Sequence, residues 1–271
     1  MIKEVIKDFP NLVKDTPGKT WLIEHDIELE DPTPIKQHPY RVNPIYLEVQ
    51  RKELDYMLEN GIIERSLSPW SSPCVLVPKT NKTIRFCTDF RRVNAVTKTD
   101  SYPIPRISDL IDRVGDACFV TKIDLLSGYW HVPFTSRAQA ISAFVTPDGL
   151  FKYKVMPFGL KNTPATFQRL MNCITQDIPG CHAYINNILV YSSTFEKHIE
   201  QLRLLFQKLD KGKLTIHLGK CAFGHATVKY LGHIVGGGKV KPVDEKIEAI
   251  KKIPRPSDRK QTRSFLLMVG F

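Results

Sequence analysis

Apolar residues recur every three or four positions in several stretches of this sequence, which is the spacing of an amphipathic helix. After Pro164, for example, Phe167, Leu170 and Met171 fall on one helical face. Proline suits the first turn of a helix, because the first backbone N–H groups have no partner within the helix. The predicted helices cover residues 48–60, 107–114, 164–176, 198–209 and 244–252.

Short runs of β-branched and aromatic residues lie between the predicted helices and indicate strands. A polar turn at 79–82 separates the runs 74–78 and 83–87, so these runs form a predicted hairpin. Residues 118–124 predict a buried strand that ends in a carboxylate. Residues 228–235 predict another pair of strands.

The arrangement of these elements favours an α+β fold. Residues 183–191 predict a further hairpin that turns at Asn186 and Asn187, since asparagine tolerates a left-handed backbone. Residues 1–44 contain six prolines and predict an extended segment. Strands and helices then alternate irregularly, which is typical of α+β proteins rather than of a doubly wound sheet.

The composition of the 271 residues is that of a globular protein, since 42% are hydrophobic and 25% are charged. These values exclude global disorder. The sequence has no run of about 18 apolar residues that could span a membrane, and its N-terminus lacks the apolar stretch of a signal peptide. Six scattered cysteines without a C-x-x-C pair predict reduced thiols in an intracellular protein.

The formal net charge of +11 is unevenly distributed along the chain. Residues 65–106 carry a net +6 and residues 197–271 a net +10, whereas residues 107–196 are neutral and residues 1–64 carry −5. Two basic blocks around a neutral middle suit a channel for a phosphate backbone. A solvated helical face would give the same pattern, so charge alone leaves both interpretations open.

Four local features, each unspecific alone, follow one another along the chain. They are a basic hairpin with Lys79, Lys82 and Arg85, a strand ending in Asp124 with Tyr129 after it, a Gly/Pro turn into a helix at 156–168, and a tight hairpin at 184–187. Together they resemble the palm and fingers of a retroelement reverse transcriptase, most closely that of gypsy-type long-terminal-repeat retrotransposons. Segments 85–91, 102–106, 123–130 and 229–233 carry the same resemblance, which runs from about residue 20 to the end.

The resemblance implies an α+β right-hand polymerase fold and RNA-directed DNA polymerisation. It implies an extended segment at 1–44, fingers at 45–115 and 142–182, a palm at 116–141 and 183–236, and the start of a thumb at 237–271. The implied partners are an RNA or DNA template with its primer and dNTPs, and no membrane. The rest of Pol, with the complete thumb, ribonuclease H and integrase, is expected in the full-length element, in a cytoplasmic particle or the nucleus.

The family's chemistry uses two Mg²⁺ ions held by three carboxylates, one at a strand end and two in the hairpin beside it. By resemblance, Asp124 takes the first position, and Leu125 would offer its carbonyl oxygen to a metal. Asn186 and Asn187 occupy the positions of the two hairpin aspartates. Lys220 matches, more loosely, a lysine that would protonate the leaving pyrophosphate.

The resemblance also implies residues that bind the nucleotide and the primer. Those expected at the nucleotide are Lys79, Lys82 and Arg85 on the triphosphate, Tyr129 as the bulky group that excludes a 2′-OH, and Phe158 with Gly159 as the floor. Those expected at the primer are Tyr184, Tyr230, Leu231, Gly232 and His233.

The hairpin departs from the family pattern, which is Tyr-x-Asp-Asp, whereas residues 184–187 are Tyr-Ile-Asn-Asn. An amide has nearly the shape of a carboxylate but no charge, so we expect the turn to survive and Mg²⁺ binding to collapse. The sequence therefore favours a polymerase fold whose chemistry is lost. The alternatives are an active polymerase that works with Asp124 alone, and a nucleic-acid-binding remnant.

Three origins account for the two asparagines: a sequencing error, an engineered substitution that blocks metal binding, and decay of a genomic copy. Decay is the simplest, because each Asp-to-Asn change needs only one G-to-A transition.

Overall fold

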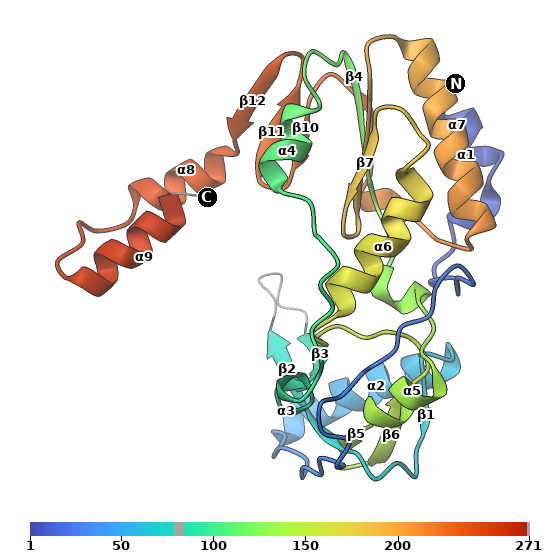
Figure 1. Cartoon of the computed structure of the whole chain (residues 1–271), viewed down its shortest axis with the longest axis vertical. Coiled ribbons are helices and arrows are strands. Elements are labelled where there is room, and N and C mark those ends of the chain that lie inside the picture. Colours follow the sequence, from blue (N-terminus) through green and yellow to red (C-terminus); the bar gives the residue numbers. More distant parts are fainter. Residues whose placement is uncertain (79–83, 270–271) are drawn as a thin grey trace.

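The computed structural model describes residues 1–78 and 84–269. Its two larger sheets lie towards opposite ends of the elongated body in Figure 1, with helix α6 between them. The expected helices and strands are present, with ends that differ by a few residues from the sequence-based bounds. Lys79 and Lys82 lie outside the described residues.

The first sheet has five strands in the order β1-β6-β5-β2-β3. Strands β2 and β3 pair antiparallel from Cys74 opposite Thr88, which confirms the predicted first hairpin. Helices α2 and α5 contact this sheet, and its core includes Phe144, whose ring stacks on that of Phe151 with 5.7 Å between the ring centres. The elements are α2 (Pro44–Glu59), β1 (Ile63–Arg65), β2 (Ser72–Pro78), β3 (Ile84–Thr88), α3 (Arg91–Ala95), α5 (Ser136–Ile141), β5 (Phe144–Thr146) and β6 (Gly149–Tyr153).

The second sheet has four strands in the order β7-β8-β4-β9. Its central strands carry fully buried side chains such as Ile123 and Val190, because helices α6 and α7 contact β7 and β8. Helix α6, which falls inside the range expected for the fingers, therefore packs on this sheet. The elements are β4 (Phe119–Asp124), η2 (Gly128–His131), α6 (Thr163–Thr175), β7 (Cys181–Tyr184), β8 (Asn187–Ser192), α7 (Phe195–Lys211), η3 (Leu218–Lys220) and β9 (Ala222–His225).

The expectation of a wholly extended N-terminal segment is wrong at its start. Helix α1 (Ile2–Lys7) and the 3-10 turn η1 (Pro10–Leu12) precede the extended part. The first proline comes only at Pro10, so nothing prevents a helix before it. Val5 is buried where α1 contacts α7, and this burial stabilises a helix too short to form alone.

The C-terminal part extends away from the body in Figure 1. A small sheet, β10-β11-β12, connects the second sheet to helices α8 and α9. Helix α4 packs against β4 and this small sheet through Leu110, Val120 and Tyr230. The elements are α4 (Ile107–Asp112), β10 (Val228–Tyr230), β11 (His233–Gly236), β12 (Lys239–Pro242), α8 (Asp244–Lys251) and α9 (Arg259–Val269).

The six cysteines, all within the described residues, form no disulfide with one another. The helices that the structure describes include none that is long and apolar enough to cross a membrane.

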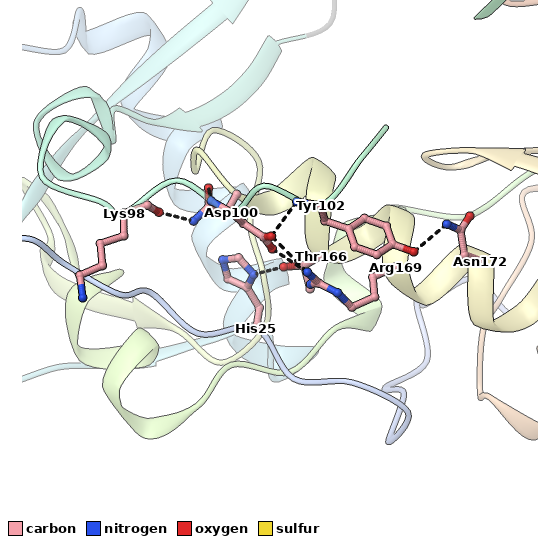
Figure 2. A network of polar contacts seen from close by, with 8 residues as sticks. His25, Lys98, Asp100, Tyr102, Thr166, Arg169 and Asn172 are labelled. Carbon is pink, nitrogen blue, oxygen red and sulfur yellow. Dashed lines mark hydrogen bonds and ion pairs between the residues drawn. The ribbon is translucent and has the colours of Figure 1, made fainter. Parts of the chain in front are cut away.

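A polar network joins the segment between α3 and α4 to helix α6 (Figure 2). Arg169 of α6 pairs with Asp100 at 3.0 Å and lies over the ring of Tyr102, 4.4 Å from its centre. On the same helix, Thr166 shares a 2.7 Å hydrogen bond with the buried His25 of the N-terminal segment. The network therefore fixes two crossing segments to one helix between the sheets.

His131 fastens η2 to the chain after α7 and gives the fold an acid-sensitive point. Its ring is fully buried, its Nδ1 donates to the Gly128 carbonyl at 3.0 Å, and its Nε2 accepts the Thr215 N–H at 2.9 Å. Burial lowers the pKa of His131 from 6.5 to about 4. Protonation would also replace the acceptor at Nε2 with a second donor.

We expect the His131→Gln variant to lose less stability in acid than the wild-type chain. The unfolded chain binds a proton at His131 at higher pH than the folded chain. The contribution of the neutral ring to the free energy of unfolding is therefore complete above about pH 6.5 and falls as the pH approaches 4. The acid-induced loss in the free energy of unfolding should be larger for the wild type than for the variant by on the order of 3 kcal/mol. Urea unfolding at pH 7, 5.5 and 4.5 measures it, with the exposed His38→Gln as control. Identical pH profiles of stability for His131→Gln and wild type would exclude His131 as a source of the acid sensitivity.

Candidate active site

The candidate site lies where β4 ends beside the β7–β8 hairpin. Asp124, the last residue of β4, pairs in register with Asn187, and Asn187 also pairs with Tyr184 across the hairpin. The turn therefore consists of Ile185 and Asn186, and the predicted turn at Asn186-Asn187 is wrong by one residue. Ile185 has a φ of +52°, a left-handed backbone that a β-branched residue rarely adopts.

The polar side chains at this end of β4 lie close to one another and interact among themselves. The Asn187 side-chain amide donates to Asn186 Oδ1 at 3.1 Å. Lys220 Nζ lies 4.0 Å from Asp124 Oδ1, although the two residues are far apart in the sequence. The Lys220 side chain is 61% exposed, so water weakens the attraction, whereas the Asp124 side chain is only 15% exposed. The formal charges of Asp124 and Lys220 cancel.

These residues do not fit a pair of Mg²⁺ ions. Hard divalent cations prefer several carboxylate oxygens, and Asp124 supplies the only carboxylate among Asp124, Asn186 and Asn187. Within residues 1–78 and 84–269, no three His, Cys, Asp or Glu side chains are grouped so that they could hold a metal ion. Leu125, expected to offer a carbonyl, uses its N–H to donate to the Asn186 carbonyl at 3.3 Å.

An aromatic platform lies beside the turn. The Tyr129 ring is 4.8 Å from that of Phe158 and 5.2 Å from that of Phe167. Burial, with a smaller contribution from Tyr184, raises the pKa of Tyr129 to about 12, so its hydroxyl stays protonated. A Cβ at Gly128 would lie 3.0 Å from the Phe167 ring and 3.2 Å from Asn186 Cβ, so a larger residue here would require these neighbours to move by a few tenths of an ångström.

The other expected residues lie on several separate elements of the fold. Phe158 is 54% exposed, and Gly159 follows it with a φ of +99° that favours glycine. Arg85 lies exposed on β3 of the first sheet, opposite Val77. Tyr184 ends strand β7, next to the turn.

Four of the residues expected at the primer, Tyr230 to His233, lie at the β10–β11 turn, whereas Tyr184 lies beside the β7–β8 turn. Leu231 and Gly232 form the β10–β11 turn with positive φ, and His233 Nδ1 lies 3.3 Å from the Leu231 carbonyl oxygen. Tyr230 is 1% exposed and its hydroxyl lies 3.5 Å from the Asn187 carbonyl oxygen. Its ring therefore packs beneath the site, away from any surface that a primer could reach.

Sequence reasoning missed Gln168, whose side chain contacts the candidate turn. The residue is fully buried on α6, and its Oε1 accepts the Ile185 N–H at 2.8 Å. The signal was present, because Gln168 directly follows Phe167 in a helix whose buried face is otherwise apolar or small. A polar side chain at a buried position usually has a specific partner.

Comparison with known sequences identifies a family. The family model described as "Reverse transcriptase (RNA-dependent DNA polymerase)" matches residues 77–235, more than half of the chain. The Retrovirus-related Pol polyproteins from transposons opus and 297 of Drosophila melanogaster are each 34% identical over the whole chain. The Transposon Tf2-7 polyprotein of Schizosaccharomyces pombe is 29% identical over the whole chain. The chain spans 28%, 26% and 21% of these three relatives.

Comparison with solved structures gives the fold. A foamy viral protease-reverse transcriptase in complex with dsDNA matches all of this chain and 57% of its own, with a TM-score of 0.90 and 23% identity. The same enzyme in complex with an RNA/DNA hybrid matches all of this chain and 37% of its own, with a TM-score of 0.88 and 23% identity. The expected α+β polymerase fold is thus confirmed. The chain belongs to the reverse transcriptase family, an RNA-directed and divalent-metal-dependent polymerase family, as a domain of the retrotransposon Pol type.

Proposed function

We propose that this domain binds a template–primer but does not extend the primer. The observation that carries the proposal is the composition of the candidate centre: Asp124 faces two amides, Asn186 and Asn187, that hydrogen-bond to each other. A centre that has to balance the charge of two divalent cations needs more than one carboxylate. The turn, in contrast, is fully formed, which supports retention of the binding surface.

The proposed partners are an RNA or DNA template with its primer, and dNTPs. The matched foamy viral structures contain dsDNA and an RNA/DNA hybrid, which supports this proposal. We assign the fingers, palm and partial thumb to the ranges expected from the sequence. The matched relatives are several times longer, which supports a full-length element that also contains the rest of Pol. The gypsy type and a location in a cytoplasmic particle or the nucleus stay predictions.

A single mixture tests the proposal. The unmodified chain is incubated with a fluorescent template–primer, dNTPs and either Mg²⁺ or Mn²⁺, and both anisotropy and primer length are followed. We expect the anisotropy to rise and the primer to keep its length. Robust extension would instead support the active alternative, in which Asp124 suffices. In that case Asp124→Ala should abolish the extension, and an unchanged rate would exclude Asp124 as its source.

The charge distribution supports a second candidate function, a module that acts only by binding nucleic acid. This function is compatible with the loss of polymerase chemistry. Residues 197–271 carry a net +10, and Lys239 and Lys241 stand exposed on β12. Protein cations release counterions from a phosphate backbone, so affinity falls as salt rises. The function would then consist of holding a strand.

We expect the affinity for an RNA/DNA hybrid to fall with salt at a log–log slope of about −3 or steeper. Lys239→Ala/Lys241→Ala should make the slope shallower by about 1 to 2. Anisotropy titrations between 50 and 300 mM NaCl measure this, and Lys3→Ala/Lys7→Ala on α1, which lies on the other side of the body in Figure 1, is the matched control. A flat affinity across this range would rule out the binding module.

A further inference from the structure

We propose that Gln168 is a positioning residue that holds the β7–β8 turn in its strained shape, independently of the side chains at 186 and 187. The two-residue turn has Ile185 at a φ of +52°. Such a turn normally has glycine, asparagine or aspartate at this position. An L-residue with a β-branched side chain pays roughly 1–2 kcal/mol there, so other contacts must stabilise the shape.

The side chain of Gln168 hydrogen-bonds to the hairpin backbone on both sides of Tyr184. Its Oε1 accepts the Ile185 N–H at 2.8 Å, and its Nε2 donates to the Ala183 carbonyl at 2.9 Å. The hairpin backbone fixes the orientation of the amide, because an N–H requires an acceptor and a carbonyl requires a donor. One planar group therefore sets the positions of two peptide units around Tyr184.

The second N–H of Gln168 connects the turn to the network between the sheets. It donates to Asn172 Oδ1 at 2.9 Å. Asn172 Nδ2 in turn donates to the Tyr102 hydroxyl at 2.7 Å (Figure 2). Arg169 lies over the Tyr102 ring and pairs with Asp100. A continuous series of contacts thus leads from the segment between α3 and α4 to the turn.

The side chain of Gln168 is fully buried, and both its carbonyl oxygen and its amide nitrogen form hydrogen bonds. Removing it leaves the Ile185 N–H and the carbonyl of the buried Ala183 without these partners, which is costly. None of its partners is a side chain of Asn186 or Asn187. The turn can therefore keep its shape whether these two residues are amides or carboxylates.

Hydrogen exchange at the Ile185 amide tests the proposal in the unmodified sequence. Gln168→Met keeps the length of the side chain and removes its polar groups, so exchange at Ile185 should be at least about tenfold faster. Gln168→Glu should stay near the wild-type rate, because burial favours the neutral carboxyl, whose oxygen still accepts this N–H. Gln176→Met, at an exposed position of the residue that ends α6, is the matched control and should change nothing.

Two further variants separate positioning from general stability. Ile185→Asn should recover part of the order lost in Gln168→Met, because asparagine tolerates the left-handed backbone. Asn172→Leu cuts the series of contacts without touching the turn, and keeps the test decisive should Gln168→Met fail to fold. We expect it to raise Ile185 exchange by a smaller factor than Gln168→Met does.

One arm of the test rests on the proposed function. In the Asn186→Asp/Asn187→Asp background, Gln168→Met should lower kcat by about 10- to 100-fold, since a displacement near 1 Å has such an effect, and leave the Kd for template–primer unchanged. If that background extends primers and Gln168→Met leaves kcat unchanged, the positioning role is refuted and the proposed function stands. If that background is inactive, the proposed function fails, and Ile185 exchange alone decides the role of Gln168. Unchanged Ile185 exchange in Gln168→Met overturns the positioning role of Gln168. If Gln168→Met does not fold, unchanged exchange in Asn172→Leu overturns this role.

Discussion

Restoring both aspartates, as Asn186→Asp/Asn187→Asp, will raise the rate of primer extension at least about a thousandfold over the unmodified chain. The backbone already presents the two side chains beside Asp124, and Gln168 holds the turn without contacting either of them. The change therefore adds two negative charges to a formed site. Single-nucleotide incorporation on a primed RNA template, with Mg²⁺ or Mn²⁺, measures the rate.

Each single restoration will recover far less than the pair. Groups that act as a unit give strongly non-additive effects, so we expect Asn186→Asp or Asn187→Asp alone to gain less than about tenfold. Adding Asp124→Asn to the restored pair should return the rate to background. A restored pair that binds the hybrid but extends it no faster than the unmodified chain would show that the amides are not what blocks the chemistry.

Phe167→Ala will lower the free energy of unfolding by about 3–5 kcal/mol, the usual cost of emptying a buried aromatic site. Phe167 is fully buried on α6, and its ring edge meets Tyr129 with 5.2 Å between the ring centres. Phe167 also lies against Gly128, so removing its ring should loosen the packing of the aromatic platform beside the turn. Urea unfolding followed by far-UV circular dichroism measures the change.

The matched control for this prediction is Phe158→Ala. Phe158 contacts the same Tyr129 ring but is 54% exposed, so its removal should cost less than about 1 kcal/mol. A loss below about 1 kcal/mol for Phe167→Ala would mean that this part of the core does not stabilise the platform.

The sequence predicted most of the elements because their signals are local. Helix α6 begins next to a proline and has a regular apolar face, and β4 is a short apolar run that ends in Asp124. Helix α1 was missed because only six residues precede its end, and its stability comes from burial of Val5 against α7. Such tertiary contacts leave no periodic signal in a short segment.

The sequence indicated candidate residues for the site but not their geometry. The family resemblance implied that Asp124 and Lys220 belong to one site, and the structure places their charged groups 4.0 Å apart. The turn was misplaced by one residue because the propensity of asparagine favours Asn186-Asn187, whereas the strand pairing requires Ile185 to take the left-handed backbone. Gln168 overrides the local preference through a contact across 17 positions of sequence, which propensity cannot predict.

The most direct test of the account is Mn²⁺ binding to the free protein, followed by electron paramagnetic resonance of the unbound ion. The unmodified chain and the Asn186→Asp/Asn187→Asp variant are titrated side by side, with Asp124→Asn in the variant background as control. The account predicts that the variant binds Mn²⁺ at least about a hundredfold more tightly than the unmodified chain, and that the control loses this gain. Equal affinities for the unmodified chain and the variant would contradict it.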